Sequence, residues 1–108
     1  MTLEQTATKF KALAHPARLR ILNLLAQQES LCVCELIRVL DEGQSFVSRH
    51  LALLREAGLV RARKQGTWAH YQLTDSGREV LSIAALDTQA ICLLDRAKLN
   101  RGDNASCQ

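Results

Sequence analysis

Residues 44–57 read QSFVSRHLALLREA, and this stretch decides the fold that the sequence predicts. Val47, Leu51 and Leu54 recur at helical spacing, which predicts an amphipathic helix with one apolar face. We expect His50 to pack between helices rather than to read bases. The opposite face carries small polar side chains and an arginine, namely Gln44, Ser45, Ser48 and Arg49. Side chains of these types can reach base edges in the major groove of DNA, so we expect a recognition helix here.

The residues before this stretch predict further helices. An apolar segment of about two helical turns covers residues 32–40, and the DEGQ turn after it contains Gly43, which gives the backbone freedom. Residues 4–14 show a short amphipathic pattern. Pro16 fits the first turn of another helix, where its missing N–H group has no cost.

The residues after the recognition helix change from helical to strand periodicity. Residues 59–73, LVRARKQGTWAHYQL, alternate in character and contain a Gln-Gly turn, which predicts a β-hairpin. Arg61, Arg63 and Lys64 lie on its first strand, where basic side chains can hold DNA phosphates. Two short helices followed by a basic hairpin describe a mainly α fold with a β-hairpin wing, the winged helix-turn-helix.

The distribution of charge agrees with DNA binding. Residues 43–72 contain five basic residues and one acidic residue, a net charge of +4, whereas the rest of the chain has a net charge of −1. Positive charge concentrated in one segment is typical of proteins that bind a polyanion. We therefore expect double-stranded DNA as the partner.

The C-terminal part predicts one long helix that opens at Thr74 and Asp75. Its apolar residues spread over a wide arc rather than one face: Val80, Ile83, Ala84, Leu86, Ile91 and Leu94. A monomer would leave much of this arc in water, so we expect a symmetric homodimer. We expect the domain to span residues 1–98, followed by a flexible tail over residues 99–108.

Other classes of protein are disfavoured by the sequence. It contains no run of about 18 apolar residues and no signal-peptide pattern, so we expect a cytoplasmic protein without a membrane segment. No histidine lies close in sequence to a cysteine, and neither a Gly-rich phosphate loop nor a suggestive carboxylate pair is present. We therefore expect a protein that is not an enzyme and uses no organic cofactor.

Cys32 and Cys34 stand one residue apart at the start of segment 32–40. Thiols in a reducing compartment favour metal binding or redox sensing over a disulfide framework. If the helix includes Cys32, the two side chains point about 200° apart and cannot hold one ion unless the first turn is reshaped. A single cysteine is often a small buried apolar residue, but two at this spacing cannot both face the same core.

Together these segments resemble the ArsR/SmtB family of metal-responsive repressors. The segments are ALAHPARLRILNLL, LCVCEL, QSFVSRHLALLREAGLV and RARKQGTWAHYQL, and they follow the order and spacing of the family across residues 5–95. The resemblance implies a winged-helix dimer that pairs through its first and last helices. It also implies a repressor that leaves its operator when an inducer binds.

The resemblance extends to the inducer. LCVCEL is similar to the ELCVCDL box of family members that sense arsenite, antimonite, cadmium or lead, which implies that Cys32 and Cys34 bind the inducer. Zinc sensors in the family use carboxylates and histidines on the last helix, and this chain has no histidine there. Cadmium and lead sensors add cysteines from an N-terminal extension, and none precedes Cys32 here. The resemblance therefore implies arsenite or antimonite.

The third ligand departs from the family pattern. Arsenic sensors of this type carry a third cysteine at the position that Ile37 occupies here, so either two thiolates suffice or Cys92 or Cys107 supplies the third. Two alternatives stay open. One is a cadmium or lead sensor of the same fold, and the other is a thiol redox or persulfide sensor in which Cys32 or Cys34 pairs with Cys92 or Cys107.

Overall fold

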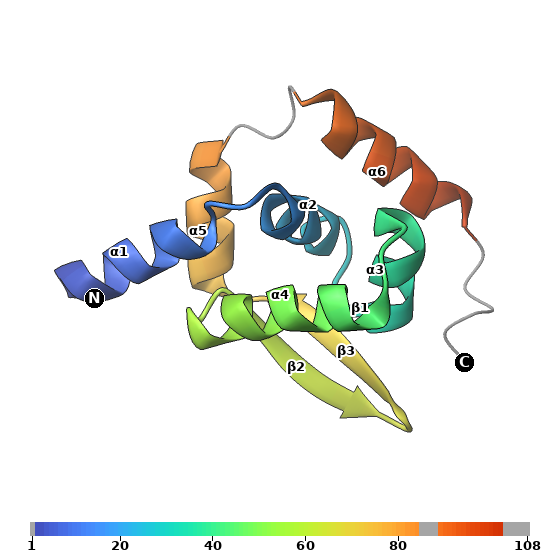
Figure 1. The fold of residues 1–108 in the computed structure, drawn as a ribbon, viewed down its shortest axis with the longest axis horizontal. Coiled ribbons are helices and arrows are strands. Elements are labelled where there is room, and N and C mark those ends of the chain that lie inside the picture. The colour runs from blue at the N-terminus through green and yellow to red at the C-terminus, as the bar shows by residue number, and fades with distance from the viewer. Residues whose placement is uncertain (1, 85–88, 103–108) are drawn as a thin grey trace.

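The computed structural model describes residues 2–84 and 89–102, which form a helical body with a projecting β-hairpin (Figure 1). The elements are α1 (Leu3–Ala12), α2 (Pro16–Leu25), β1 (Leu31–Cys32), α3 (Val33–Leu40), α4 (Gln44–Glu56), β2 (Val60–Gln65), β3 (Trp68–Leu73), α5 (Asp75–Ala84) and α6 (Ala90–Arg101). Helices α3 and α4 form the helix-turn-helix, and β2 and β3 form the wing. The fold is the winged helix-turn-helix that the sequence predicts.

The hydrophobic core lies where α2, α3 and α4 meet, and it is mainly aliphatic. Leu22 of α2, Leu36 of α3 and Leu51 of α4 are all 0% exposed. Val47 and Leu54 are buried with Leu51, which confirms the apolar face predicted for α4. Burial of this face fixes the rotation of α4 about its axis, so its polar face must point outward.

A short strand that the sequence did not predict joins the wing to the body. Leu31 and Cys32 form β1, which pairs with β3 in an antiparallel sheet of order β1-β3-β2. Leu31 lies opposite Tyr71, and Cys32 lies opposite His70. Cys32 therefore pairs with β3 of the wing and also lies directly before α3.

The turn between α3 and α4 reaches its geometry through a different residue from the one predicted. Asp41, not Gly43, adopts the left-handed conformation, with φ 55° and ψ 46°. Gly43 is extended, with φ −71°, and is the N-cap of α4. Asp tolerates the left-handed region better than most residues do, and Gly is an acceptable N-cap, so both positions suit their residues.

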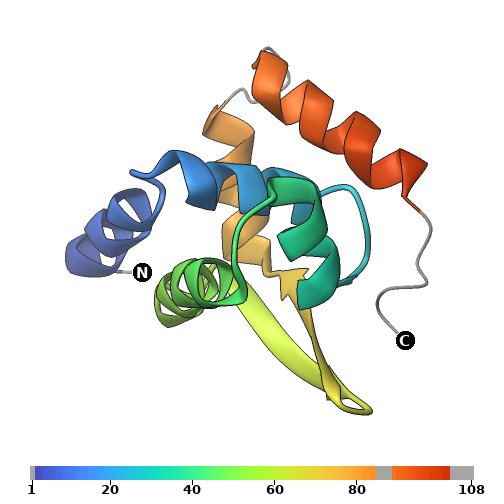
Figure 2. The same cartoon turned by 45° about the vertical axis from the view of Figure 1, so that its right-hand side comes forward.

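The single long C-terminal helix predicted from Thr74 onward is wrong. Helix α5 ends at Ala84, α6 begins at Ala90, and Gln89 is the extended N-cap of α6, with ψ 121°. Figures 1 and 2 show that the two helices point in different directions. Apolar residues at helical spacing occur on both sides of the break, which explains why the periodicity concealed it.

The C-terminal end of α6 belongs to the folded body. Leu99 is 6% exposed and packs in the core cluster, and the helix continues to Arg101. Residues 99–101, which were expected to belong to the flexible tail, are therefore helical. The remainder of the predicted tail, residues 103–108, lies outside the described residues.

Large apolar side chains remain exposed on α1, α5 and α6. They are Leu3, Phe10, Ile83, Ile91, Leu93 and Leu94. Leu86, which the sequence places in the same group, lies outside the described residues. Within the described part of the chain, no helix combines the length and apolar character needed to cross a membrane.

Candidate nucleic-acid interface and thiol pair

The outward face of α4 presents the predicted base-reading residues together. Gln44, Ser45, Ser48 and Arg49 are all exposed, while the apolar face of the same helix is buried. The guanidinium carbon of Arg49 lies 5.8 Å from the centre of the Phe46 ring, a cation–π distance. This contact limits the positions of the Arg49 side chain before any DNA arrives. The geometry fits direct reading of bases in the major groove.

The basic residues of the wing are exposed on β2, next to α4. Arg61, Arg63 and Lys64 all face solvent, and Gly66 takes a positive φ of 64° in the turn that joins the two strands. Figure 1 shows the wing extending from the body below α4. An exposed basic strand beside a recognition helix can contact the phosphates that flank the groove.

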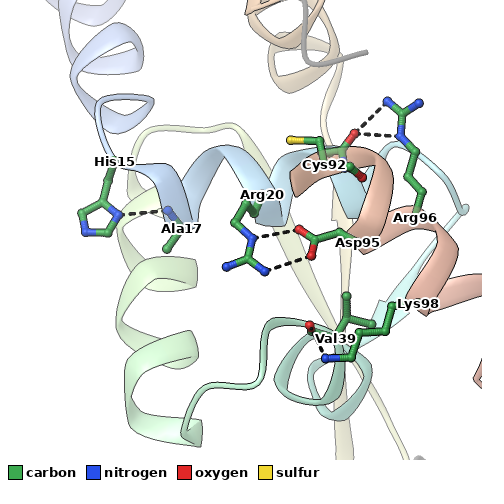
Figure 3. Close-up of polar contacts among 9 residues, drawn as sticks. His15, Ala17, Arg20, Val39, Cys92, Asp95, Arg96 and Lys98 are labelled. Atoms are coloured by element: carbon green, nitrogen blue, oxygen red, sulfur yellow. Dashed lines mark hydrogen bonds and ion pairs between the residues drawn. The ribbon is translucent and has the colours of Figure 1, made fainter. Parts of the chain in front are cut away.

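His50 anchors α4 to the start of α2 through an aromatic cluster. It is 5% exposed, and its ring centre lies 4.4 Å from that of His15 and 4.6 Å from that of Phe46. His15 is the N-cap of α2, and its Nδ1 accepts a hydrogen bond from the Ala17 amide at 3.0 Å (Figure 3). The sequence predicted the packing role of His50 but not its partner. The His-Pro pair at 15–16, an N-cap before a proline, was the available signal.

Burial lowers the pKa of His50 from its ordinary value of 6.5, and the neighbouring His15, Arg18 and Arg49 lower it further. Glu42 acts weakly in the opposite direction. The folded protein therefore binds fewer protons at this site than the unfolded chain does. The contribution of His50 to the free energy of unfolding is complete above the pKa that His50 has in the unfolded chain. It is lost as the pH falls through the lower pKa that His50 has in the folded protein.

We expect the free energy of unfolding to fall as the pH is lowered below about 6.5, the pKa of histidine in an unfolded chain. Urea denaturation between pH 7.5 and pH 5 would measure this. A His50→Phe variant keeps an aromatic ring but cannot take up the proton, so its loss of stability should be smaller. An equal loss in both proteins would show that His50 does not cause the pH dependence.

The two clustered cysteines lie at the junction of β1 and α3. Cys32 is 3% exposed and extended, with φ −67° and ψ 144°, and it is the N-cap of α3. Its Sγ accepts a hydrogen bond from the amide of Cys34 at 3.4 Å. The helix therefore begins at Val33, and the prediction that two helical side chains diverge does not apply to this pair. Cys34 is half-buried in the first turn of α3.

Cys92, one of the two candidate third ligands, does not join this pair. Cys92 is buried in the first turn of α6, where desolvation and the nearby Asp95 raise the pKa of its thiol. Among residues 2–84 and 89–102, no three His, Cys, Asp or Glu side chains are arranged to hold a metal ion. Cys107 lies outside the described residues.

Similarity to known proteins agrees with this geometry. A family model described as "Bacterial regulatory protein, arsR family" matches residues 15–62. The arsenical resistance operon repressor of Bacillus subtilis is 35% identical over 96 residues, which cover 89% of this chain and 87% of that protein. This chain belongs to the ArsR family. It is therefore a DNA-binding transcriptional regulator and not an enzyme, as the sequence predicts.

Other relatives within the ArsR family extend this picture. The arsenical resistance operon repressor of Escherichia coli is 55% identical over 65 residues, which cover 60% of this chain and 56% of that protein. A cadmium resistance regulatory protein CadC homologue from Staphylococcus aureus is 35% identical over 69 residues, 64% of this chain and 57% of that protein. The solution structure of the homodimeric winged helix-turn-helix domain of Mb0332 from Mycobacterium bovis has a TM-score of 0.72 at 31% identity, with 79% of each chain covered.

Proposed function

We propose that this ArsR-family protein is a cytoplasmic repressor that leaves its operator when arsenite or antimonite binds Cys32 and Cys34. The observation that carries the proposal is the position of Cys32. This residue pairs with His70, within β3 of the wing, and also caps α3, the first helix of the helix-turn-helix. A ligand that moves Cys32 would therefore act on β3, which pairs with β2, and on α3, which precedes α4.

The chemistry of the site suits a soft, thiophilic ion. Trivalent arsenic and antimony prefer sulfur ligands, and each bond from arsenite to a thiol forms with loss of one water molecule. An ion held by both sulfurs would draw the Cys32 Sγ away from the Cys34 amide and remove the cap of α3. The DNA-binding conformation and the ligand-bound conformation would then exclude each other. The arsenical resistance repressors among the relatives support this choice of inducer.

DNA recognition is assigned to the exposed faces of α4 and β2. We propose that Arg49, with Gln44, Ser45 and Ser48, contacts bases, and that Arg61, Arg63 and Lys64 contact phosphates. The exposure of all these side chains on neighbouring elements supports the assignment. A homodimer would present two recognition helices to an operator with two-fold symmetry.

The dimer is proposed to form through the exposed apolar residues of the first and last helices, α1 and α6. Leu94 is 64% exposed and Ile91 48% exposed on α6, and Phe10 is 49% exposed on α1. An apolar surface of this kind favours burial against a second copy. The homodimeric state of the M. bovis relative supports a dimer.

We expect Leu94→Glu to convert the dimer to a monomer and to weaken operator binding at least about tenfold, because the proposed interface would bury an unpaired carboxylate. Sedimentation equilibrium at micromolar concentration would show the change in mass. Gln27→Glu, which places the same charge at an exposed position on neither α1 nor α6, should remain dimeric. A wild-type protein that sediments as a monomer would contradict the dimer.

The experiment that tests the function is release of a fluorescently labelled operator, measured by anisotropy. Arsenite, antimonite, cadmium, lead, zinc and an oxidant are added separately to the protein–DNA complex. The proposal requires release at the lowest concentrations by arsenite or antimonite. Release by cadmium or lead alone would favour the second candidate, which the CadC homologue supports. Release by the oxidant alone, with an intramolecular cysteine cross-link in the mass spectrum, would identify a redox sensor.

A further inference from the structure

The C-terminal ends of α3 and α6 are joined by reciprocal hydrogen bonds. Nζ of Lys98, on α6, donates to the carbonyl oxygen of Val39, on α3, at 3.0 Å (Figure 3). In return, Nη1 of Arg38, on α3, donates to the carbonyl oxygen of Lys98 at 3.3 Å. Both carbonyls lie in the last turn of their helices, where they lack helical partners and the helix dipole favours a positive charge. Each helix thus caps the other.

Arg38 is held in position from two sides. Its Nε donates to Oε2 of Glu35 at 3.1 Å, and the Glu35 side chain is only 5% exposed. On the other side lies Gly102, directly after α6, where an added Cβ would lie 2.1 Å from Nη2 of Arg38. The guanidinium therefore fits between the first turn of α3 and the backbone that ends α6. Glu35 is the residue next to Cys34.

Helix α6 is also anchored independently on α2. Asp95, which is buried, accepts two hydrogen bonds from Arg20, at 2.8 and 2.9 Å (Figure 3). Asn23 donates to the carbonyl oxygen of Cys92 and accepts from Arg96. These contacts attach the N-terminal and central parts of α6 to the core. The Arg38–Lys98 contacts then attach the other end of α6 to the helix that carries the thiol pair.

We propose that Arg38 and Lys98 are positioning residues that hold α3 in its DNA-binding orientation, and that the inducer must break their contacts to release the operator. The second half of this inference rests on the proposed function. An ion that rearranges Cys32 and Cys34 would move the neighbouring Glu35, which holds Arg38 in position. Arg38 would then no longer donate its hydrogen bond to the carbonyl oxygen of Lys98. The contacts stabilise the DNA-binding conformation against the inducer-bound one, so they set how much inducer is required.

The test is operator release by arsenite from a Lys98→Met variant, which keeps the length and apolar stem of the side chain but cannot donate to Val39. We expect the arsenite concentration at half-release to fall about tenfold, a typical size for coupling between two sites. Operator affinity without arsenite should fall by no more than the same factor. Arg101→Met is the matched control, because it removes the same charge from an exposed position on the same helix. Its half-release concentration should stay at the wild-type value.

A second variant and a second measurement make the outcome decisive. Arg38→Lys keeps the charge but loses the planar fork that joins Glu35 to Lys98, so it should also lower the half-release concentration. A merely structural role would lower the melting temperature of both variants and leave half-release unchanged, which would overturn the inference. Failure of the proposed function would look different, because wild-type protein would then not release DNA with arsenite at all. If arsenite does not release DNA from the wild-type protein, operator affinity still tests the positioning role. An operator affinity equal to that of the wild type in Lys98→Met and Arg38→Lys would overturn it.

Discussion

Replacing Cys32 or Cys34 by serine is expected to leave operator binding intact and to abolish release by arsenite. Serine is a better N-cap than cysteine, so Cys32→Ser should keep α3 capped and the helix-turn-helix in its DNA-binding form. A hydroxyl oxygen is a hard donor and does not replace a thiolate as a ligand for a soft ion. We expect the arsenite concentration at half-release to rise by at least about a hundredfold, which corresponds to loss of the coupling between the two sites. The measurement is the anisotropy titration described above.

The other two cysteines supply the controls for this experiment. Cys92→Ser should respond as wild type does, because Cys92 lies on α6 outside the pair at the start of α3. Cys107→Ser should respond normally or lose a modest part of its arsenite affinity if it supplies a dispensable third ligand. If a protein with both Cys32→Ser and Cys34→Ser still releases DNA at wild-type arsenite concentrations, the inducer binds elsewhere.

Arg49→Ala is expected to reduce both the affinity and the sequence specificity of DNA binding. A bidentate arginine–base contact contributes about 1–3 kcal/mol of discrimination, so the preference for operator over random DNA should fall by about five- to a hundredfold. The Phe46 ring beneath Arg49 restricts its motion, which favours a defined contact over a diffuse charge. Competition binding between operator and random duplexes at fixed salt would measure the ratio.

The wing residues give the contrast that makes the Arg49 result interpretable. Arg63→Ala and Lys64→Ala should weaken binding to operator and to random DNA by similar factors. Each should also lower the slope of log affinity against log salt by about one, as loss of a single phosphate contact does. Equal losses on operator and random DNA for Arg49→Ala would show that α4 does not read bases through this side chain.

Periodicity was sufficient to predict the parts of the fold that are buried on one face. The spacing of Val47, Leu51 and Leu54 predicted both the helix and which of its faces is buried. The exposed face of α4 followed, because it is the side of the helix opposite these residues. The hairpin was predictable for a different reason, because the Gln-Gly turn contains Gly66, which supplies the positive φ that the turn adopts.

The parts that the sequence did not predict depend on contacts between distant residues. Whether Cys32 belongs to a helix or to a strand is decided by its pairing with His70, which a local pattern cannot contain. The break between α5 and α6 is stabilised by polar contacts such as Arg20 with Asp95, 75 positions apart in the sequence. Asp41 adopts the left-handed conformation at the C-cap of α3, while Gly43 is extended at the N-cap of α4, a division of roles that composition alone does not reveal.

The double attachment of Cys32 also has a consequence for how a cell would respond to the inducer. Coupling between two binding sites is reciprocal, so if arsenite lowers operator affinity, operator DNA must lower arsenite affinity by the same factor. On this proposal, copies of the protein on DNA would keep Cys32 in β1 and at the cap of α3, and they would be the last to bind the inducer. Copies that are not on DNA would bind arsenite first and would lower the concentration of free arsenite. The arsenite dose that switches transcription should therefore rise with the number of repressor copies per operator.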